Sequence, residues 1–279
     1  ILPLLANIAL DGIEKHLKNW IEHQTVPGLT FKDGKIAKRK SIAVIRYADD
    51  FVILHQNLDI LKKAKEEFSQ WLQETSKNRL MQRTFFLRSM LGFNEEKTRI
   101  VKVTNGFQFL GFSIILIKRH GTYRTHIYAS KTAQSRLIQK IGDTCRRNRA
   151  ISSYSLINRL RPIVLRWGNY YKYSECKDVF KSMDYKIFNI LRAWVFRRAR
   201  KNRGRIETKA KYFPSDQAFQ FEDRLYKDNW VLTGQQRGEK GEKIQNFLPK
   251  LAWIQSSKYV QIRRNASPYD GNNFILTSK

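Results

Sequence analysis

Two adjacent aspartates, Asp49 and Asp50, lie between apolar runs at residues 42–47 and 51–54. Aspartate is disfavoured in strands, and its burial costs free energy unless the carboxylate is paired or bound to a metal. Carboxylates are the hard oxygen ligands that Mg²⁺ prefers, and phosphoryl transfer uses two such ions about 3.5–4 Å apart. An Asp-Asp pair is also a common surface β-turn. The context favours metal binding, because a surface hairpin is not expected to be apolar on both faces.

Hydrophobic periodicity predicts the elements that would position this pair. Residues 42–47 and 51–54 are β-prone and indicate a hairpin with both carboxylates at its bend. Apolar residues at helical spacing predict helices over residues 2–17 and 58–72, separated by a basic loop over residues 35–40. Further strands of the same sheet are expected at residues 100–103, 107–117 and 123–128.

The pattern after residue 130 is helical. Apolar residues recur at helical spacing around Leu137, Leu160 and Ile187, which predicts three helices packed as a small bundle. The last helix is expected to run from residue 177 to residue 202. Beyond Gly204 the sequence is irregular, with short strand-like pieces at residues 230–232 and 259–262. The expected fold class is α+β: a mainly antiparallel sheet with helices, then an all-α bundle, then a small irregular basic region.

The chain is strongly basic, with 53 Lys and Arg against 24 Asp and Glu and a net charge of +29. Residues 1–100 carry +5 of this charge (17 basic minus 12 acidic residues), and residues 101–279 carry +24 (36 minus 12). Basic side chains that neutralise phosphates release condensed counterions. Nucleic acid is therefore the first expected partner, and an anionic membrane surface the second.

The remaining composition limits the setting of the protein. The longest apolar run, at residues 109–117, is far shorter than the roughly 20 residues of a spanning helix, so no membrane insertion is expected. Cys145 and Cys176 have the spacing of neither a zinc module nor a disulfide framework, which fits a reducing cytoplasm, including a nucleoid or an organellar matrix. The first residue is Ile1, no signal peptide pattern follows it, and the first methionine is Met81, so a longer protein is expected.

Five stretches resemble motifs of reverse transcriptases, in the form typical of group II intron-encoded proteins. Tyr-Ala-Asp-Asp-Phe-Val-Ile at residues 47–53 resembles the active-site motif, and residues 2–10 resemble the helix after the family's Pro-Gln-Gly loop. Residues 92–100 resemble the next palm motif, and Gly-Phe-Gln-Phe-Leu-Gly-Phe at residues 106–112 resembles the primer-grip hairpin. Residues 161–171 resemble the maturase-specific domain X, which forms the thumb. The motifs follow the family order, and the resemblance covers essentially the whole chain.

The resemblance implies a partial right-hand polymerase. Residues 1–128 would form a palm remnant, residues 129–203 the thumb or domain X, and residues 204–279 a DNA-binding-like region. Asp49 and Asp50 would be catalytic and would bind Mg²⁺.

Two further polymerase roles follow from the resemblance. Lys97 would lie near the incoming triphosphate, where a basic group can protonate the departing pyrophosphate; an exposed lysine in a turn is an equal alternative. Phe109, Leu110 and Gly111 would form the primer grip, with the glycine allowing close approach of a nucleic-acid backbone, although the same letters fit a core strand. We expect the aromatic side chains to be core and the backbone to provide the grip.

Basic residues of the thumb are the expected RNA contacts. Residues 151–200 contain 11 basic and 3 acidic residues, an excess that a solvated face does not explain. The expected RNA-binding residues are Lys172, Arg192, Arg197, Arg198, Arg200 and Lys201. Arg263 and Arg264 are the expected DNA contacts, because aromatic and basic residues interleave in the tail.

The aromatic residues of the thumb allow two roles. Trp167 and Trp194 are assigned to the core, whereas Tyr170 and Tyr171 fit either base stacking or packing. On the last helix, Trp194 is expected to face the core, and Arg192, Arg198 and Lys201 are expected to face away from it.

The resemblance implies two functions for the intact protein. One is the binding of group II intron RNA to help it fold and splice; the other is the copying of RNA into DNA at a target DNA, with Mg²⁺ and deoxynucleotides. The family's fingers and first metal-binding aspartate would lie upstream of Ile1, so the chain alone is expected to be inactive as a polymerase. A dimer or a missing N-terminal part would complete the palm. The alternatives are a non-catalytic RNA-binding maturase and a decayed gene product.

Overall fold

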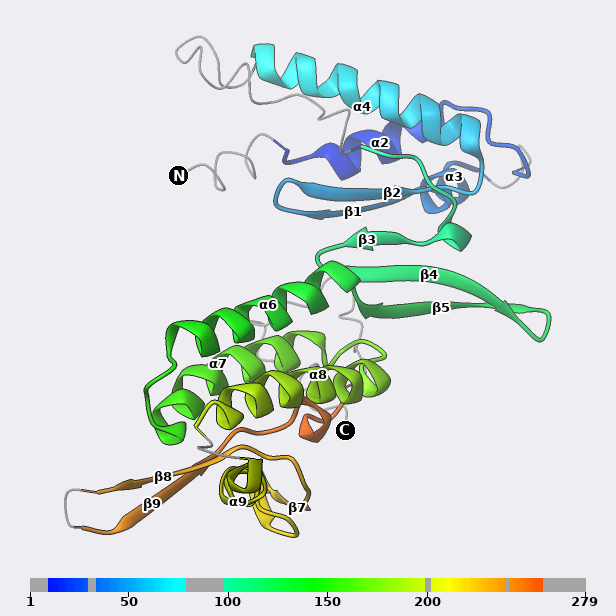
Figure 1. Ribbon diagram of the computed structural model, residues 1–279. Coiled ribbons are helices and arrows are strands. Elements are labelled where there is room, and N and C mark those ends of the chain that lie inside the picture. Colours follow the sequence, from blue (N-terminus) through cyan, green and yellow to red (C-terminus); the bar gives the residue numbers. More distant parts are fainter. Residues whose placement is uncertain (1–9, 30–33, 79–97, 199–201, 239–240, 258–279) are drawn as a thin grey trace. The chain divides into compact units, whose positions relative to one another are not determined.

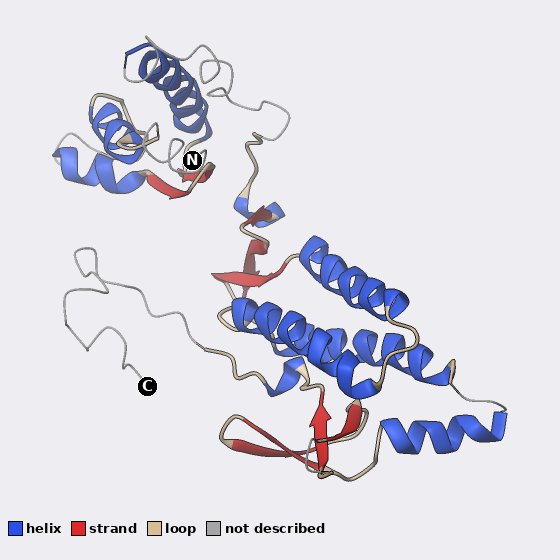
Figure 2. Cartoon of the chain, turned by 90° about the vertical axis from the view of Figure 1, so that its left-hand side faces the viewer, coloured by secondary structure: helices blue, strands red, loops and turns tan. Residues whose placement is uncertain are grey.

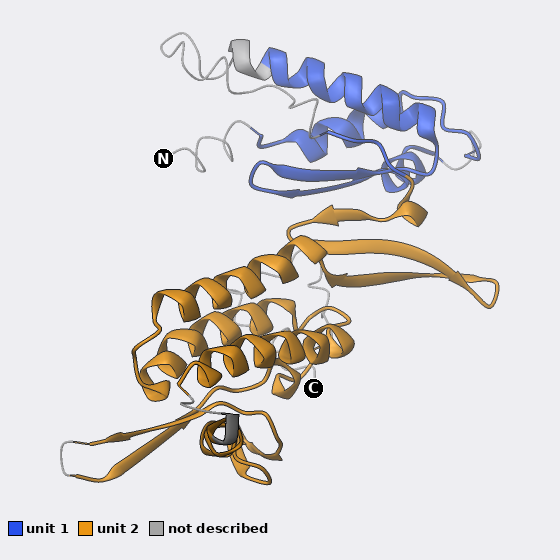
Figure 3. Ribbon diagram, in the orientation of Figure 1, with its two compact units in different colours: residues 1–101 blue, residues 102–279 orange. Residues whose placement is uncertain are grey.

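The computed structural model describes residues 10–29, 34–78, 98–198, 202–238 and 241–257 (Figure 1). The chain divides into two compact units, residues 1–101 and 102–279 (Figure 3). Both contain helices and small antiparallel sheets, so the fold class is α+β, as the sequence predicts. The assignment of these parts to a palm and a thumb, with a boundary after residue 128, remains a prediction.

The first unit combines one hairpin with three helices in its described part. Strands β1 (Ala43–Tyr47) and β2 (Asp50–Leu54) pair in antiparallel register. The helices are α2 (Ile13–Glu22), α3 (Gly34–Ser41) and α4 (Leu58–Asn78). The hairpin and the helix that starts at residue 58 confirm the sequence predictions.

One face of the β1–β2 hairpin packs against α2 and α4. Leu17 and Phe68 are buried in this cluster, and Val44, Phe51 and Ile53 are half-buried against it. Successive side chains of a strand point to opposite faces of the sheet. The alternate positions of β1 therefore lie on the face that this cluster does not cover.

Two expectations for the first unit need correction. The helix predicted over residues 2–17 begins at Ile13 within the described part, because Gly12 before it has φ 87, a left-handed conformation outside a helix; residues 1–9 lie outside the described residues. The basic loop predicted over residues 35–40 is helix α3. Lysine and arginine are good helix formers, and Lys38 Nζ is held by the carbonyls of Glu22 (3.0 Å) and Gln24 (2.7 Å).

The second unit starts with a three-stranded antiparallel sheet in the order β3-β4-β5. Its strands, preceded by the 3-10 helix η2 (Val103–Asn105), are β3 (Phe107–Phe109), β4 (Phe112–Arg119) and β5 (Thr122–Ala129). The predicted single sheet is therefore wrong, since this sheet is separate from the β1–β2 hairpin. The strand predicted over residues 107–117 is two strands, because Leu110 and Gly111 form a tight turn. The strand predicted at residues 100–103 is absent from this described stretch.

Three helices follow, as predicted: α6 (Lys131–Arg147), α7 (Ser153–Tyr171) and α8 (Lys177–Phe196). They lie side by side in Figure 1 and again in Figure 2, which is turned by 90°. Ser130 and Ser152 cap α6 and α7, because each side-chain oxygen accepts a hydrogen bond from a backbone N–H of the first turn. The predicted continuation of the last helix to residue 202 is wrong. Helix α8 ends at Phe196, and α9 (Asn202–Tyr212) is a separate helix.

Two hairpins follow α9 where the sequence predicts irregular structure. Strand β6 (Ala218–Phe221) pairs with β7 (Arg224–Lys227), and β8 (Thr233–Arg237) pairs with β9 (Lys243–Phe247), before the 3-10 helix η3 (Leu251–Trp253). The strand predicted at residues 230–232 is wrong: this stretch is a loop that buries Val231 and Leu232. The strand predicted at residues 259–262 lies outside the described residues.

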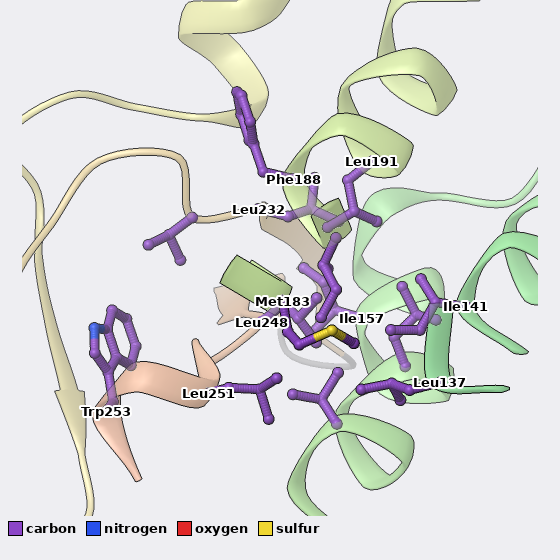
Figure 4. Close-up of a cluster of buried hydrophobic side chains, with 14 of the residues drawn as sticks. Leu137, Ile141, Ile157, Met183, Phe188, Leu191, Leu232, Leu248, Leu251 and Trp253 are labelled. Atoms are coloured by element: carbon purple, nitrogen blue, oxygen red, sulfur yellow. The ribbon is translucent and has the colours of Figure 1, made fainter. Parts of the chain in front are cut away.

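One hydrophobic core joins the bundle to these hairpins (Figure 4). It runs from Ala129 to Ile254, with Met183 of α8 and Leu251 of η3 both fully buried. None of the helices within the described ranges is both long and apolar enough to cross a membrane.

Two glycines allow the close approach of the C-terminal segments to α7. A Cβ atom on Gly168 would overlap the side chain of Ile254, and a Cβ atom on Gly234 would overlap the backbone of Tyr154. Any larger residue at Gly234 must displace the main chain of α7, since no side chain can move aside there.

Candidate functional site

The aspartate pair lies at the tip of the β1–β2 hairpin. Ala48 and Asp49 form its two-residue turn, and Asp50 is the first residue of β2. Ala48 has φ 53, a left-handed conformation that two-residue hairpin turns favour because its twist matches that of the strands. Arg46 Nη1 donates a hydrogen bond to the Ala48 carbonyl at 3.2 Å. The hairpin backbone thus positions the pair as the sequence predicts.

Both carboxylates are open to solvent. Asp49 and Asp50 are exposed, and within the described ranges neither side chain makes an ion pair or a hydrogen bond. Beside them, Tyr47 is 65% exposed and Ile45 is 49% exposed. The hairpin is thus a surface hairpin with apolar residues on its uncovered face, which the sequence argument did not expect.

The donor set fits a divalent cation in part. Carboxylate oxygens are the correct ligand type for Mg²⁺. The described stretches contain no cluster of three or more His, Cys, Asp or Glu side chains that could hold a metal ion. Asp49 and Asp50 therefore supply part of a two-metal site, and the further ligands that such a site needs are not among the residues described.

The turn between β3 and β4 is held from outside through its carbonyl groups. Leu110 (φ 49) and Gly111 (φ 77) form this turn. Tyr170 Oη donates to the Leu110 carbonyl at 2.9 Å, and Tyr171 Oη donates to the Gly111 carbonyl at 3.4 Å. The backbone N–H of Ser130 donates to the same Gly111 carbonyl at 2.8 Å. A Cβ atom on residue 111 would lie 2.6 Å from Tyr171 Oη, so this contact requires glycine.

Aromatic packing adds to this link between the turn and α7. The ring of Phe112 lies 5.3 Å from that of Tyr170 and 4.9 Å from that of Tyr171, between ring centroids. Tyr171 is buried, as the packing alternative expects, whereas Tyr170 is 49% exposed. Phe109 of the predicted primer grip is half-buried. The sequence gives no signal for the two hydroxyl contacts, because each tyrosine lies 60 residues from its partner.

The helical bundle presents an excess of positive charge. Residues 131–198 contain 16 Lys and Arg and 4 Asp and Glu. Within that span the one ion pair of a Lys or Arg in the described structure is Arg146 with Asp143. Arg192 and Arg197 are exposed, as the sequence predicts, and Lys172 is half-buried with Nζ 5.5 Å from the ring centroid of Tyr173.

Arg198 departs from its expected orientation. Its guanidinium lies 3.4 Å from the ring centroid of Trp194 instead of facing away from the core. It donates to the carbonyls of Trp194 (3.1 Å), Arg149 (2.7 Å) and Ile151 (2.8 Å). A cation is favourable at the carbonyl end of a helix, so Arg198 ties the end of α8 to the loop before α7. Trp194 itself is buried, as predicted, at 2% exposure.

Five predicted site residues lie outside the described ranges. They are Lys97, Arg200, Lys201, Arg263 and Arg264. Their roles stay predictions.

Asp184 is an ionisable group that the sequence argument missed. Its carboxylate accepts hydrogen bonds from the backbone N–H groups of Leu251 (2.8 Å) and Ala252 (2.9 Å), so it caps η3 and joins it to α8. Burial raises the pKa of Asp184 to about 6, against the lowering effect of these bonds. Burial likewise raises the pKa of Cys145 to about 11, which keeps this thiol protonated and unreactive.

Comparison with known proteins gives two family matches. Residues 2–114 match the reverse transcriptase (RNA-dependent DNA polymerase) family, and residues 134–213 match the maturase-specific domain of group II introns. No curated protein sequence matches the chain significantly. The first match includes both hairpin turns, and the second includes almost all of the bundle. Reverse transcriptase domains typically use a divalent metal, and the two domains together imply intron RNA and other nucleic acid as partners.

Proposed function

The chain belongs to the group II intron-encoded reverse transcriptases and maturases, and we propose that it binds structured intron RNA through the cationic surface of its helical bundle. The observation that carries this proposal is the charge of the segment matched to the maturase-specific domain. Its exposed arginines have few acidic partners in the described structure. Phosphates attract such residues strongly, because each neutralised phosphate releases counterions.

The residues of this surface have different roles in the proposal. Arg192 and Arg197 contact RNA phosphates directly, and Lys172, Arg200 and Lys201 are further proposed RNA contacts. Arg198 acts through the fold, since its guanidinium is occupied by three carbonyl groups.

We further propose that the β1–β2 hairpin belongs to the palm of an RNA-directed DNA polymerase. Asp49 and Asp50 would bind Mg²⁺, which when bound supplies Lewis-acid activation of the primer hydroxyl and of the departing pyrophosphate. Lys97 would lie beside the triphosphate. The turn at Leu110 and Gly111 would hold the primer backbone, and the bonds from Tyr170 and Tyr171 support this role because they fix the turn to the proposed thumb.

A non-catalytic maturase is the second candidate. The observation that favours it is that Asp49 and Asp50 lack further acidic or histidine neighbours in the described structure. Polymerase activity would then require a further carboxylate from outside the described residues or from a second copy of the chain. Arg263 and Arg264 are proposed contacts to target DNA in either case.

RNA binding is tested with the whole chain and a structured group II intron RNA. The logarithm of the affinity should fall with the logarithm of salt concentration between about 50 and 200 mM, with a slope of several units. Arg192→Gln together with Arg197→Gln should lower that slope by about one to two units. Lys15→Gln with Lys63→Gln is the matched control, because these exposed lysines lie in the first unit. An affinity that does not depend on salt would contradict the proposal.

Metal binding is tested separately from activity. Mn²⁺ at micromolar concentration should broaden the backbone amide signals of residues 48–51 in an NMR spectrum of the chain, and Asp49→Asn with Asp50→Asn should abolish this. Asp11→Asn, at another exposed aspartate, should leave the broadening unchanged. The chain alone should not extend a primer. Mg²⁺-dependent DNA synthesis that Asp49→Ala abolishes would instead establish a complete site.

A further inference from the structure

The end of the β4–β5 hairpin forms a basic arm that the proposed function does not use. We define the arm as residues 117–125, every one of which is exposed. Figure 1 shows the hairpin continuing beyond the helices of its own unit. Two paired strands with no layer packed on either face are marginal in water on their own, so this exposure requires an explanation.

The register of the strands divides the arm into two faces. Lys118 is opposite Tyr123, and side chains directly opposite one another share a face of the sheet. Lys118 Nζ lies 5.7 Å from the ring centroid of Tyr123, which is 57% exposed. Arg119 and Arg124 lie on the other face, because Ile117, two residues before Arg119, is opposite Arg124. Each face thus presents cations with an exposed apolar or aromatic side chain.

The segment that contains the arm carries no acidic residue of its own, and Glu175 pairs with His126, directly after the arm. The sequence contains no Asp or Glu between Glu96 and Asp143. In the structure as described, Lys118, Arg119 and Arg124 make no ion pair. Arg119 and Arg124 repel one another on their shared face. A single lysine would be enough to protect an edge strand from aggregation, so this function does not account for two arginines and a tyrosine.

The shape of the arm limits what it can bind. His120 (φ 48) and Gly121 (φ 79) form a two-residue turn, so the arm stays two strands wide to its tip. Within the arm, residues 117–119 pair with residues 122–124, which corresponds to a ribbon about 10 Å long at roughly 3.3 Å per residue. A ribbon of two strands is narrow enough to enter a groove of duplex DNA. In duplex RNA, contacts of this kind reach the phosphates and the wide minor groove.

We propose that the arm binds the phosphate backbone along a groove of a nucleic-acid duplex, as a second contact separate from the bundle surface. Lys118 on one face and Arg119 and Arg124 on the other would contact phosphates on both sides of the groove. Tyr123 would pack against the sugar edge. This inference rests on the proposed function for one premise only, namely that the ligand is a nucleic acid.

The test compares two triple variants of the whole chain. Lys118→Thr, Arg119→Thr and Arg124→Thr remove the charge of the arm and keep good strand formers. Lys15→Gln, Lys62→Gln and Lys63→Gln remove the same charge from exposed helix positions of the first unit. Binding is measured with 20-base-pair RNA, DNA and hybrid duplexes and with a single strand of the same length. The arm variant should lose about tenfold or more in duplex affinity, and its salt slope should fall by about two to three units.

Each outcome decides the proposal. A loss confined to one kind of duplex supports the arm and identifies the groove that it fits. A loss of duplex affinity no larger than that of the control variant would overturn the proposal. An equal loss of affinity for the single strand would also overturn it. Either result would mean that the arm attracts any polyanion. If Arg192→Gln with Arg197→Gln also leaves RNA affinity unchanged, the proposed bundle surface fails independently. Unchanged melting temperatures of both triples establish that folding is intact.

Discussion

The two hairpin turns that carry the proposed polymerase residues are built in opposite ways. The turn at Ala48 and Asp49 presents side chains, and its carboxylates are exposed without a partner in the described structure. The turn at Leu110 and Gly111 presents its backbone, and both of its carbonyls accept hydrogen bonds from α7 or Ser130.

This difference follows from what each turn is proposed to bind. A carboxylate that is to bind a metal must keep lone pairs free for the ion, and in the described structure the positions of Asp49 and Asp50 are set by the strands on either side. A turn that holds a primer through its backbone groups cannot adjust to the primer by moving a side chain. It must therefore be fixed by other parts of the fold, here by two tyrosines.

The largest expected effect comes from adding a methyl group to the turn at Gly111, in contrast to removing one from the turn at Ala48. Gly111→Ala should destabilise the second unit by about 2–4 kcal/mol, since alanine at positive φ costs about 1–2 kcal/mol and the displaced Tyr171 hydroxyl costs about as much again. The measurement is urea unfolding, with hydrogen exchange at the Ser130 amide as a local probe. The opposite change at the other turn, Ala48→Gly, should leave the first unit as stable or slightly more stable. Equal losses at both turns would contradict the comparison.

A buried carboxylate provides the contrast to the exposed pair. The pKa of Asp184 is about 6 in the folded chain and 3.8 ordinarily, so the folded state binds more protons between these values. Its contribution to the free energy of unfolding should therefore fall as pH rises from about 4 to 6, by about 3 kcal/mol at most.

Asp184→Asn should remove most of this slope in unfolding experiments at several pH values. The paired control is Asp49→Asn, which should change the free energy of unfolding by no more than about 0.5 kcal/mol at any pH because the site is exposed. A slope that persists in Asp184→Asn would assign it to another group.

Two neighbouring arginines directly after α8 repeat the contrast. Arg198→Ala should cost about 2 kcal/mol, since three carbonyl groups lose a charged donor. Arg197→Ala should leave the melting temperature nearly unchanged and weaken RNA binding. If the two variants show the reverse, Arg198 is the RNA contact that the sequence predicted and Arg197 the structural residue.

The smallest expected effect comes from the tyrosine hydroxyls. Tyr170→Phe should cost about 0.5–1 kcal/mol, because its bond to the Leu110 carbonyl lies at the surface. The phenylalanine keeps the stacking on Phe112, so exchange at the Ser130 amide should rise only slightly. A loss of primer-template affinity much larger than this stability change would sharpen the comparison, by showing that the turn must be held in position to bind.

Local sequence patterns predicted the elements whose partners are near in the chain. The β1–β2 hairpin and the three helices of the bundle follow from apolar spacing, because buried side chains recur at the period of the element that buries them. Apolar spacing alone missed the turn at Leu110, because Phe-Leu-Gly-Phe reads as one apolar strand; the resemblance of residues 106–112 to the primer-grip hairpin did indicate a hairpin there. Strands β8 and β9 were missed because their residues are mostly polar and their pairing depends on packing against α7.

The orientations of individual basic side chains were predicted less well. Charge counting identified a basic bundle but could not distinguish Arg198 from Arg197, since the carbonyls of Arg149 and Ile151 lie 49 and 47 residues away from Arg198. The aspartate pair was found from its two letters and their flanks. The sequence could not show that the second apolar face of the β1–β2 hairpin is exposed, because exposure depends on which elements pack against that face.

The shared core of the bundle and the C-terminal hairpins limits how genes of this family can recombine. The maturase-specific match ends at residue 213, but the core continues to Ile254. A crossover at residue 213 would join the α7 of one parent to the η3 and β8 of another. Gly168 and Gly234 leave no space for a mismatch at these contacts. Substitutions on the two sides of this border should therefore be inherited together, and the unit of exchange extends well beyond the segment that sequence similarity recognises.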